Sequence, residues 1–267
     1  MSDNLLLFEK HGHLAKVTLN RPDKRNPLGL AGDGEQFHAM AKRVNDDFEI
    51  RCVIMTGAGS AFSAGGDLKA MRDRTGEFGG DNLHLREHYR SSIHGIIKAM
   101  WSIEVPIVGA INGPAIGLGG DVASLCDIRL AATSAKFGAT FLKMGLIPGD
   151  GGAWLLPRII GWSRAAQLYF TGDVVDAETA RDWGLISEVY ADDQLLAEAA
   201  KLAAKIIQQP PQALRMTKRL MRDGVNASFD TIMEMSAAMQ VLVQRTDDHV
   251  EAVNAFFEKR PPVFTGK

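Results

Sequence analysis

The chain has 267 residues, a length that suits one α/β domain with a helical extension. Hydrophobic residues make up 46% of it and charged residues 23%, as in a globular protein with a sizeable core. A formal net charge of −2, with scattered lysine and arginine, argues against a nucleic-acid partner, and no apolar run is long enough to span a membrane.

The first half of the chain alternates short apolar runs with helical patterns. We expect strands at residues 5–9, 14–19, 51–56, 106–112 and 127–132, with a further short one near Phe137. We expect helices from about residue 32 to 48 and over 121–126. From residue 68 we expect the start of a helix, then a mobile loop, and then a helix that continues to residue 100. Because buried strands alternate with helices in this way, the pattern predicts an α/β core with parallel strands.

After Gly151 the pattern becomes almost wholly helical. We expect short helices at 154–160, 164–170 and 177–183, a small strand at 187–190, and longer helices at 194–208, 212–223 and 229–259. Pro210 and Pro211 separate two of these, because proline does not continue a helix. The chain is therefore expected to divide into a core over residues 1–200 and a helical region over 201–267.

Cysteine usage and the N-terminus both favour a cytoplasmic protein. Cys52 and Cys126 each lie in an apolar stretch, which favours buried reduced thiols over a disulfide or a metal site. The N-terminal sequence MSDNLLLFEK lacks a basic region followed by a long apolar segment, so we expect no signal peptide.

Two glycine-rich loops each follow a predicted buried strand and each precede a helix. They read AFSAGGDL, at residues 61–68, and NGPAIGLGGD, at residues 112–121. Either loop alone is typical of a structural turn. Together they can direct two backbone N–H donors at one oxygen atom and so form an oxyanion hole. Neither loop has the Gly-Lys-Ser/Thr of a nucleotide P-loop, and no acidic ribose partner indicates a dinucleotide site.

With their surroundings, these loops resemble the crotonase superfamily, the enoyl-CoA hydratase/isomerase family. The resemblance rests on AFSAGGDLKAM, VPIVGAINGPAIGLGGDVASLCDIRLAA and KFGATFLKMGLIPGDGG, with NRPDKRNPL near the start and FFEKRPPVFTGK at the end. It covers essentially the whole chain. It implies a crotonase-like ββα spiral core with a helical C-terminal trimerisation region, in a homotrimer or dimer of trimers. It also implies an acyl-CoA substrate, with coenzyme A only as part of that substrate, and no other cofactor or metal.

The resemblance implies roles for individual residues. The oxyanion donors are the backbone N–H groups of Gly66 and Leu118; many relatives have glycine at the second position, but only the backbone is needed. The C-terminal Phe256 and Lys259 match positions through which a neighbouring subunit closes over the coenzyme, although helix packing and a solvated charge also explain them. The positions expected to bind coenzyme A or the acyl group are Lys24, Arg25, Asn26, Ser63, Ala64, Gly65, Asp67, Leu68, Gly117 and Phe141.

Both glutamates that hydratases of this family use for proton transfer are absent. The first position is Asp121. Its side chain is one C–C bond shorter than that of glutamate, so its carboxylate lies about 1.5 Å closer to the backbone. The second is Phe141, which transfers no proton. Asp150 is the remaining candidate for proton transfer. In the isomerases and hydrolases of the family that use an aspartate, the catalytic aspartate aligns one position earlier, with Gly149 of this chain. Asp121 is equally typical of an acid in a helix first turn, and Asp150 of a helix N-cap.

Histidines offer no clear alternative chemistry. His84, His88 and His94 lie on one predicted helix. His84 and His88 are four residues apart and so share a face, but nothing supplies a third ligand for a metal on that face. We therefore expect exposed or partly buried histidine side chains. Tyr89 and Arg86 lie on the same helix, in a segment that relatives use to shape the acyl pocket.

The leading functional hypothesis is an enoyl-CoA hydratase, a lyase that adds water to a 2-enoyl-CoA through a stabilised enolate. Two alternatives keep Asp150 as the reacting group, in an enoyl-CoA isomerase or a CoA-thioester hydrolase. A third is a non-catalytic acyl-CoA binder, for which the loss of an acid at Phe141 is the best support.

Overall fold

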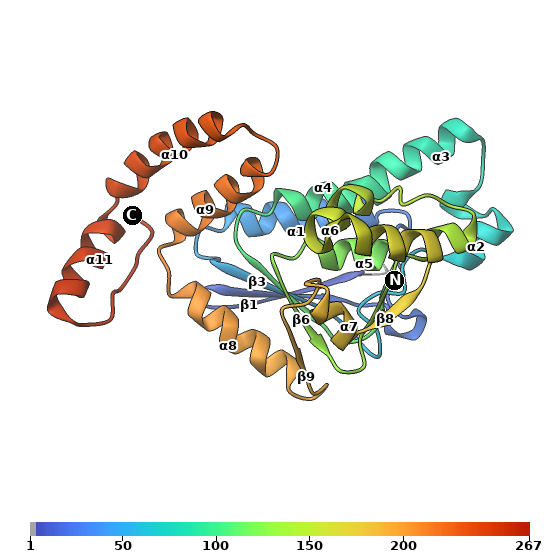
Figure 1. Cartoon of the computed structure of the whole chain (residues 1–267), viewed down its shortest axis with the longest axis horizontal. Coiled ribbons are helices and arrows are strands. Elements are labelled where there is room, and N and C mark those ends of the chain that lie inside the picture. The colour runs from blue at the N-terminus through green and yellow to red at the C-terminus, as the bar shows by residue number, and fades with distance from the viewer. Residues whose placement is uncertain (1–3) are drawn as a thin grey trace.

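A six-stranded sheet forms the centre of the molecule (Figure 1), whose computed structural model describes residues 4–267. Residues 1–3 belong to the stretch in which no signal peptide is expected and lie outside the described residues. The strand order is β1-β2-β3-β4-β6-β9. In chain order the strands are β1 (Leu6–His11), β2 (Leu14–Leu19), β3 (Cys52–Gly57), β4 (Ile107–Ile111), β6 (Ile128–Ala132) and β9 (Glu188–Tyr190).

All neighbours in this sheet are parallel except the first pair. β1 and β2 form an antiparallel hairpin that turns at Gly12, where φ is +58°, a conformation that favours glycine. The remaining pairs, from β2·β3 to β6·β9, are parallel, as the sequence predicts. β3 and β4 are buried along their whole length because helices cover both faces of the sheet.

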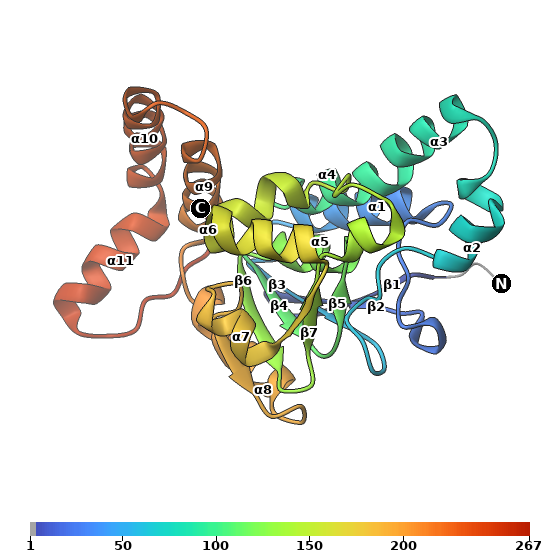
Figure 2. The same cartoon turned by 45° about the vertical axis from the view of Figure 1, so that its right-hand side comes forward.

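The helices lie in unequal layers on the two faces (Figures 1 and 2). A large core cluster, with Phe37, Phe62 and Met100 among its fully buried members, packs one face. Its helices are α1 (Asp33–Asp46), α4 (His94–Ser102), α5 (Leu118–Ser124) and α6 (Gly152–Thr171). The other face packs against α8 (Leu195–Ile207), which buries Leu195 against Ile54. Cys52 and Cys126 are both buried and free, as expected.

A second, three-stranded sheet lies beside the first. It contains β5 (Ala115–Ile116), β7 (Lys136–Gly138) and β8 (Val174–Asp176), in the order β5-β7-β8. The sequence predicts only β7 of these, because two- and three-residue strands leave no periodic pattern. β5 matters for function because it belongs to the second glycine-rich loop.

The segment before β4 follows the expected order of a helix start, a connecting segment and a helical run to about residue 100. It contains α2 (Leu68–Asp73), the 3-10 turn η2 (Gly76–Phe78) and α3 (Asn82–His88). The π-helical turn η3 (Tyr89–Ile93) then joins α3 to α4. The helical run is therefore present, as the sequence predicts, but it is not regular throughout, and such π turns are frequent at functional sites.

In the second half, one helix boundary is as expected and one is not. The two helices expected at 154–160 and 164–170 both lie within α6, which is interrupted between them by the non-helical Gly161, where φ is +76°. The single helix expected over 229–259 is instead α10 (Phe229–Gln244) and α11 (Asp247–Glu258). The Thr246 side chain accepts the His249 N–H at the start of α11, and this N-cap begins a new helix.

The C-terminal helices extend away from the sheet (Figures 1 and 2). α7 (Ala177–Asp182) stays on the core, whereas α9 (Pro211–Gly224), α10 and α11 form an arm. The boundary expected at residue 200 falls inside α8, which packs on the sheet. Within residues 4–267, no helix is long and apolar enough to cross a membrane.

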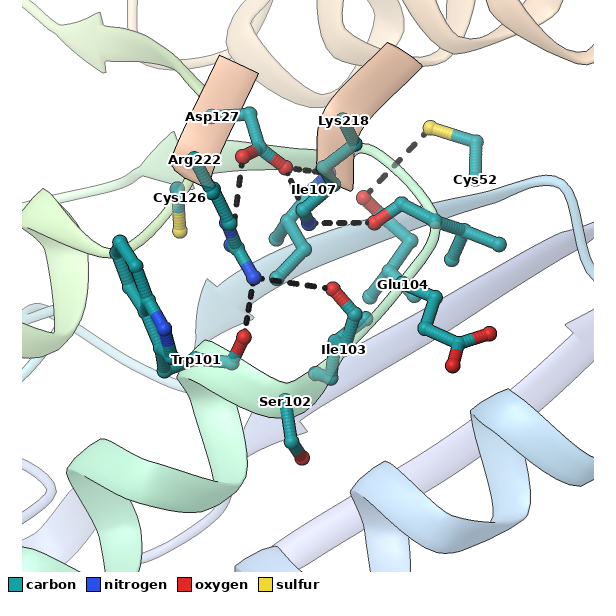
Figure 3. A network of polar contacts seen from close by, with 12 residues as sticks. Cys52, Trp101, Ser102, Ile103, Glu104, Ile107, Cys126, Asp127, Lys218 and Arg222 are labelled. Carbon is teal, nitrogen blue, oxygen red and sulfur yellow. Dashed lines mark hydrogen bonds and ion pairs between the residues drawn. The ribbon is translucent and has the colours of Figure 1, made fainter. Parts of the chain in front are cut away.

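A buried polar network ties α9 to the sheet (Figure 3). Lys218 Nζ lies 2.6 Å from Asp127 Oδ2 and donates to the carbonyl oxygen of Val105 at 2.6 Å. Arg222 contacts the other carboxylate oxygen of Asp127 at 3.4 Å and also donates to the backbone carbonyls of Trp101 and Ile103 at the end of α4. Asp127 Oδ2 in turn accepts the backbone N–H of Ile107 at 2.8 Å. The carboxylate of Asp127 is thus saturated with contacts and helps to hold α9 to the core, together with the pair of Arg215 and Glu104.

Candidate active site

The two glycine-rich loops lie side by side at the carboxyl ends of β3 and β4. Ser63 N donates to Pro114 O at 3.0 Å, and Ile116 N donates to Ser63 O at 3.0 Å. Gly65 has φ of +88°, and a Cβ there would lie 2.6 Å from Ile116 O. The close approach of the loops therefore requires glycine at position 65.

Two backbone N–H groups from these loops open on the same cavity. Leu118 is the first residue of α5, so its N–H has no partner within the helix. Gly66 follows the tight turn at Gly65, and a Cβ on Gly65 would lie 3.6 Å from Leu118 N. Within residues 4–267, neither the Gly66 nor the Leu118 N–H donates a hydrogen bond. The pair can therefore stabilise a developing oxyanion.

The cavity that these donors face has a volume of about 120 Å³ and mostly apolar walls. Met71 and Ile93 come from the helical segment before β4, and Phe141 comes from the 3-10 turn η4 (Thr140–Met144). Asp150 is the one carboxylate among the described residues that line it. Apolar walls around two N–H donors and a single acid are suited to acid–base chemistry next to a carbonyl group.

Asp150 is enclosed but has no bonding partner. Its side chain is 5% exposed, and it makes no hydrogen bond within residues 4–267. Burial raises its pKa from 3.8 to about 6, and the charge of His94 opposes that rise. The N-cap of α6 is Gly151, without any side-chain cap bond, so the alternative reading of Asp150 as an N-cap is wrong.

Asp121 lies behind the cavity wall rather than on it. It is in the first turn of α5, and its Oδ2 accepts the Gly152 N–H at 3.1 Å. Burial, and then the charge of Asp150, raise its pKa well above 3.8, which favours the protonated carboxyl. A Cβ at position 152 would lie 2.1 Å from Asp121 Oδ1, so only glycine fits where α6 begins. Asp150 is therefore the acid that faces the cavity, and Asp121 is the acid behind it.

Aromatic side chains surround the two acids. The ring of Phe141 lies 6.5 Å from the ring of Tyr169, whose hydroxyl is buried without a partner in residues 4–267. Burial and the charges of both acids raise the pKa of Tyr169, so its hydroxyl remains neutral. Tyr89 lines the cavity itself, and burial followed by the charge of Asp150 raises its pKa too.

Of the histidines, His94 contacts the site and His88 does not match its expectation. His94 Nε2 donates to Gly149 O at 2.9 Å, which ties α4 to the loop that presents Asp150. The sequence gives no signal for this contact, because it joins residues 55 positions apart. His88 is buried, with Nδ1 2.8 Å from Glu77 Oε2, so exposed or partly buried is the wrong expectation for it. Within residues 4–267, no group of side chains could hold a metal.

The structure brings about half of the expected site residues together. Those that line the cavity are Ala64, Gly65, Gly66, Leu68, Gly117, Leu118, Phe141 and Asp150. Side chains that the sequence does not single out add to them, namely Leu28, Met71, Phe78, Ile93, Met144 and Leu146. Their apolar character is typical of any core, so only the fold reveals that they face a cavity.

Other expected residues support the loops instead. The Asn26 side chain is buried and donates to the carbonyl oxygens of Ala58 and Ala61, both at 2.9 Å. Ser63 Oγ donates to Asn26 O at 2.7 Å, and Asp67 caps α2. These three side chains therefore hold the first glycine-rich loop in shape.

The expected basic and C-terminal contacts lie outside the cavity. Lys24 and Arg25 are exposed on the loop before it. Phe256 is 79% exposed in α11, and Lys259 follows the end of that helix. α11 is at the opposite end of the molecule from α2 and α3 (Figures 1 and 2), so neither residue reaches the cavity of its own chain.

A larger hollow of about 680 Å³ lies elsewhere, between α6, α8 and α9. Its charged lining includes Asp127, Lys218 and Arg222, which bind one another. It has no glycine-rich loop and no unpaired carboxylate, so the smaller cavity is the better candidate for chemistry.

The fold and cavity define an α/β protein built to bind a carbonyl compound beside an acid. Residues 9–267 match the family model for enoyl-CoA hydratase/isomerase. The chain is 37% identical to 1,2-epoxyphenylacetyl-CoA isomerase of Escherichia coli, over 94% of each chain, and 35% identical to crotonyl-CoA hydratase of Syntrophomonas wolfei, over 98% of each. An enoyl-CoA hydratase structure from Bacillus anthracis superposes with a TM-score of 0.91 at 33% identity, over 98% of this chain and 100% of that one.

The chain belongs to the enoyl-CoA hydratase/isomerase family. The crotonase-like fold class expected from the sequence is confirmed, with its mixed α/β core and helical C-terminal region.

Proposed function

We propose that the chain adds water to a 2-enoyl-CoA thioester, as an enoyl-CoA hydratase. The observation that carries the proposal is the unpaired Asp150 carboxylate, which shares a cavity with the N–H groups of Gly66 and Leu118. The names of relatives at 32–37% identity, among them crotonyl-CoA hydratase and short-chain-enoyl-CoA hydratase, support the same reaction. Coenzyme A enters as part of the substrate, and no other cofactor is proposed.

In this reaction the thioester oxygen accepts hydrogen bonds from Gly66 and Leu118. Asp150 takes a proton from water while the hydroxide adds to the β-carbon, and the electron pair of the C=C bond moves to the thioester oxygen as an enolate. Asp150 then returns the proton to the α-carbon, so the net change is one water added. Burial and the charge of Asp150 raise the pKa of Asp121 behind the wall, which favours its protonated form beside the ionised Asp150.

A second candidate is isomerisation of the double bond. Only one carboxylate of the described chain lines the cavity, and one carboxylate suffices to move a proton between two carbons of the acyl chain. The relative that is 37% identical is named as an isomerase. In this reaction the same N–H pair stabilises the dienolate.

The test is a substrate panel with Asp150→Asn as the inactive control. Hydration is measured as loss of enoyl absorbance from crotonyl-CoA and from longer and aromatic 2-enoyl-CoAs. Isomerisation is measured as a gain of the same absorbance when 3-enoyl-CoAs are the substrates. Release of free thiol measures thioester hydrolysis. Turnover of the 3-enoyl substrates alone selects the second candidate. Coenzyme A binding by calorimetry, without turnover of any substrate, contradicts both and leaves an acyl-CoA binder.

We also propose that the chain assembles as a homotrimer or a dimer of trimers. α10 buries no residue although apolar side chains such as Phe229, Met233 and Val241 are more than half exposed, and Phe257 of α11 is 78% exposed. Such an area on one arm favours contact with other copies of the chain. Phe256 and Lys259 would then reach the coenzyme site of a neighbour. Light scattering measures the assembly, and a monomer at micromolar concentration contradicts it.

A cytoplasmic location is the last part of the proposal. Both cysteines, Cys52 and Cys126, are buried and free, as suits a reducing compartment. Cell fractionation tests it, and recovery of the chain with secreted proteins contradicts it.

A further inference from the structure

The π-helical turn η3 begins at Tyr89, and Tyr89 and Ile93 at its two ends both line the cavity. We propose that the Tyr89 hydroxyl orients the reacting water together with Asp150, and so serves as a second polar contact in a cavity where Phe141 has no polar side-chain atom. The inference rests on the proposed hydration reaction and assigns Tyr89 a part in it.

The Tyr89 ring is held close to the loop that presents Asp150. Its Cε1 would lie 3.5 Å from a Cβ on Gly149, the residue before Asp150. The rings of His88 and His94 pack edge-on against it, with centroids at 6.4 and 6.1 Å. Because His94 also donates to Gly149 O, the same histidine positions both the Tyr89 ring and the loop of Asp150.

Neither polar group is used by the fold. Within residues 4–267, the Tyr89 hydroxyl and the Asp150 carboxylate make no hydrogen bond, although both face the cavity. A buried carboxylate in a protein is normally paired, so the unpaired Asp150 points to a ligand that supplies the missing bond, and the partly buried Tyr89 lies on the wall of the same cavity. A water molecule bound to both is such a ligand.

Asp150 and Tyr89 each bind a different hydrogen of the water molecule. An ionised carboxylate only accepts hydrogen bonds, so Asp150 takes one hydrogen of the water. The Tyr89 oxygen accepts the other hydrogen, and a lone pair of the water is then free to attack the β-carbon. In the reverse direction the Tyr89 oxygen accepts the hydrogen of the β-hydroxyl group while protonated Asp150 gives its proton to the hydroxyl oxygen, and the group departs as water. Since burial and the charge of Asp150 raise its pKa, Tyr89 stays neutral and exchanges no proton in either direction.

Other polar side chains near the cavity are less suited to this part. His94 uses Nε2 to bind Gly149 O. The Tyr169 hydroxyl is buried outside the cavity lining.

The experiment compares Tyr89→Phe with the wild-type chain and with Tyr190→Phe, a matched control on β9 away from the cavity. Tyr89→Phe keeps the ring packing and removes only the hydroxyl. We expect its kcat for hydration to fall by about tenfold to a hundredfold, as for loss of a hydrogen bond to a charged site, with KM nearly unchanged. We expect Tyr190→Phe to match the wild type.

A double-variant cycle separates orientation of water from packing. If Tyr89 and Asp150 act on one water, Tyr89→Phe costs nothing further in the Asp150→Asn background. The same loss in both backgrounds, or a change in KM alone, overturns the inference while leaving hydration in place. A wild-type chain that hydrates no enoyl-CoA overturns the proposed function as well.

Discussion

Asp127 and Asp150 differ in whether their carboxylates have bonding partners in the folded chain. Asp127, at the start of β6, is held by Lys218, Arg222 and a backbone N–H. Asp150 is more buried, with 5% of its surface exposed, and has no partner within residues 4–267. A carboxylate that supports structure is saturated with hydrogen bonds, whereas one left unpaired beside a cavity is available to a substrate.

The difference has a thermodynamic consequence. Raising the pKa of the Asp150 carboxyl from 3.8 to about 6 costs about 3 kcal/mol of folding free energy once it ionises. The folded state binds the proton more tightly than the unfolded state, so this cost is absent below pH 3.8, grows as pH rises, and is complete above pH 6. The site is thus less stable at the pH where its base is active.

Replacing Asp150 by Asn gives the largest expected effect. Without the proton-transfer group, kcat for hydration falls by about 10²- to 10⁴-fold. At pH 7 the variant is more stable than the wild type, by about 1–3 kcal/mol, because the buried charge is gone. Steady-state kinetics and urea unfolding measure the two quantities. A variant that is both inactive and less stable would show that Asp150 supports the fold, and the contrast with Asp127 would be lost.

Replacing Asp127 by Asn produces the opposite pattern. It leaves Lys218, whose side chain is 7% exposed, without a counter-charge, so we expect a loss of about 3 kcal/mol in the free energy of unfolding. The matched control is Asp223→Asn, which removes an exposed pair with Arg219 and costs less than about 1 kcal/mol. The folded Asp127 variant keeps its hydration rate. Equal losses for the two variants in urea unfolding would contradict the role of Asp127 as the anchor of α9.

The same contrast explains what could be predicted from the sequence. Glycine requirements are local: the turn at Gly65 and the orphan N–H of Leu118 follow from the residue type and its place at a strand end or helix start, so the sequence predicts the paired loops. The pKa of Asp150 depends on its burial and on the charge of His94, and both arise only in the folded chain. Sequence spacing leaves Asp150 open between a helix cap and a base, and the structure excludes the cap.

The errors in secondary structure have an equally physical origin. The apolar spacing over 229–259 runs past Arg245 without a break, and only the cap at Thr246 shows where α11 begins. The π turn at Tyr89 adds no distinctive residue type, so periodicity predicts an ordinary helix there. Both features depend on single hydrogen bonds that a pattern of apolar residues does not record.

The pH dependence of hydration tests the ionisation of Asp150 directly. Its base form is the carboxylate, so kcat/KM rises with pH through about 6 and levels off above it, with about a tenfold loss for each pH unit below. We assign the acid limb to Asp150, because Asp150 lines the cavity and Asp121 does not. A flat profile between pH 5 and 7 for the chemical step would contradict the assignment.

Replacing His94 by Gln gives the smallest expected effect, a shift in the acid limb of the pH profile. The charge of His94 lowers the pKa of Asp150, so His94→Gln, which keeps an N–H donor for Gly149 O but removes the charge, moves the acid limb to higher pH. Activity at pH 8 changes little, because Asp150 is ionised there in both proteins. His84→Gln on α3, an exposed position, is the control and leaves the limb in place. An unmoved limb with lower activity at every pH would mean that His94 acts only by holding the loop, and that the low dielectric of the cavity alone sets the ionisation of Asp150.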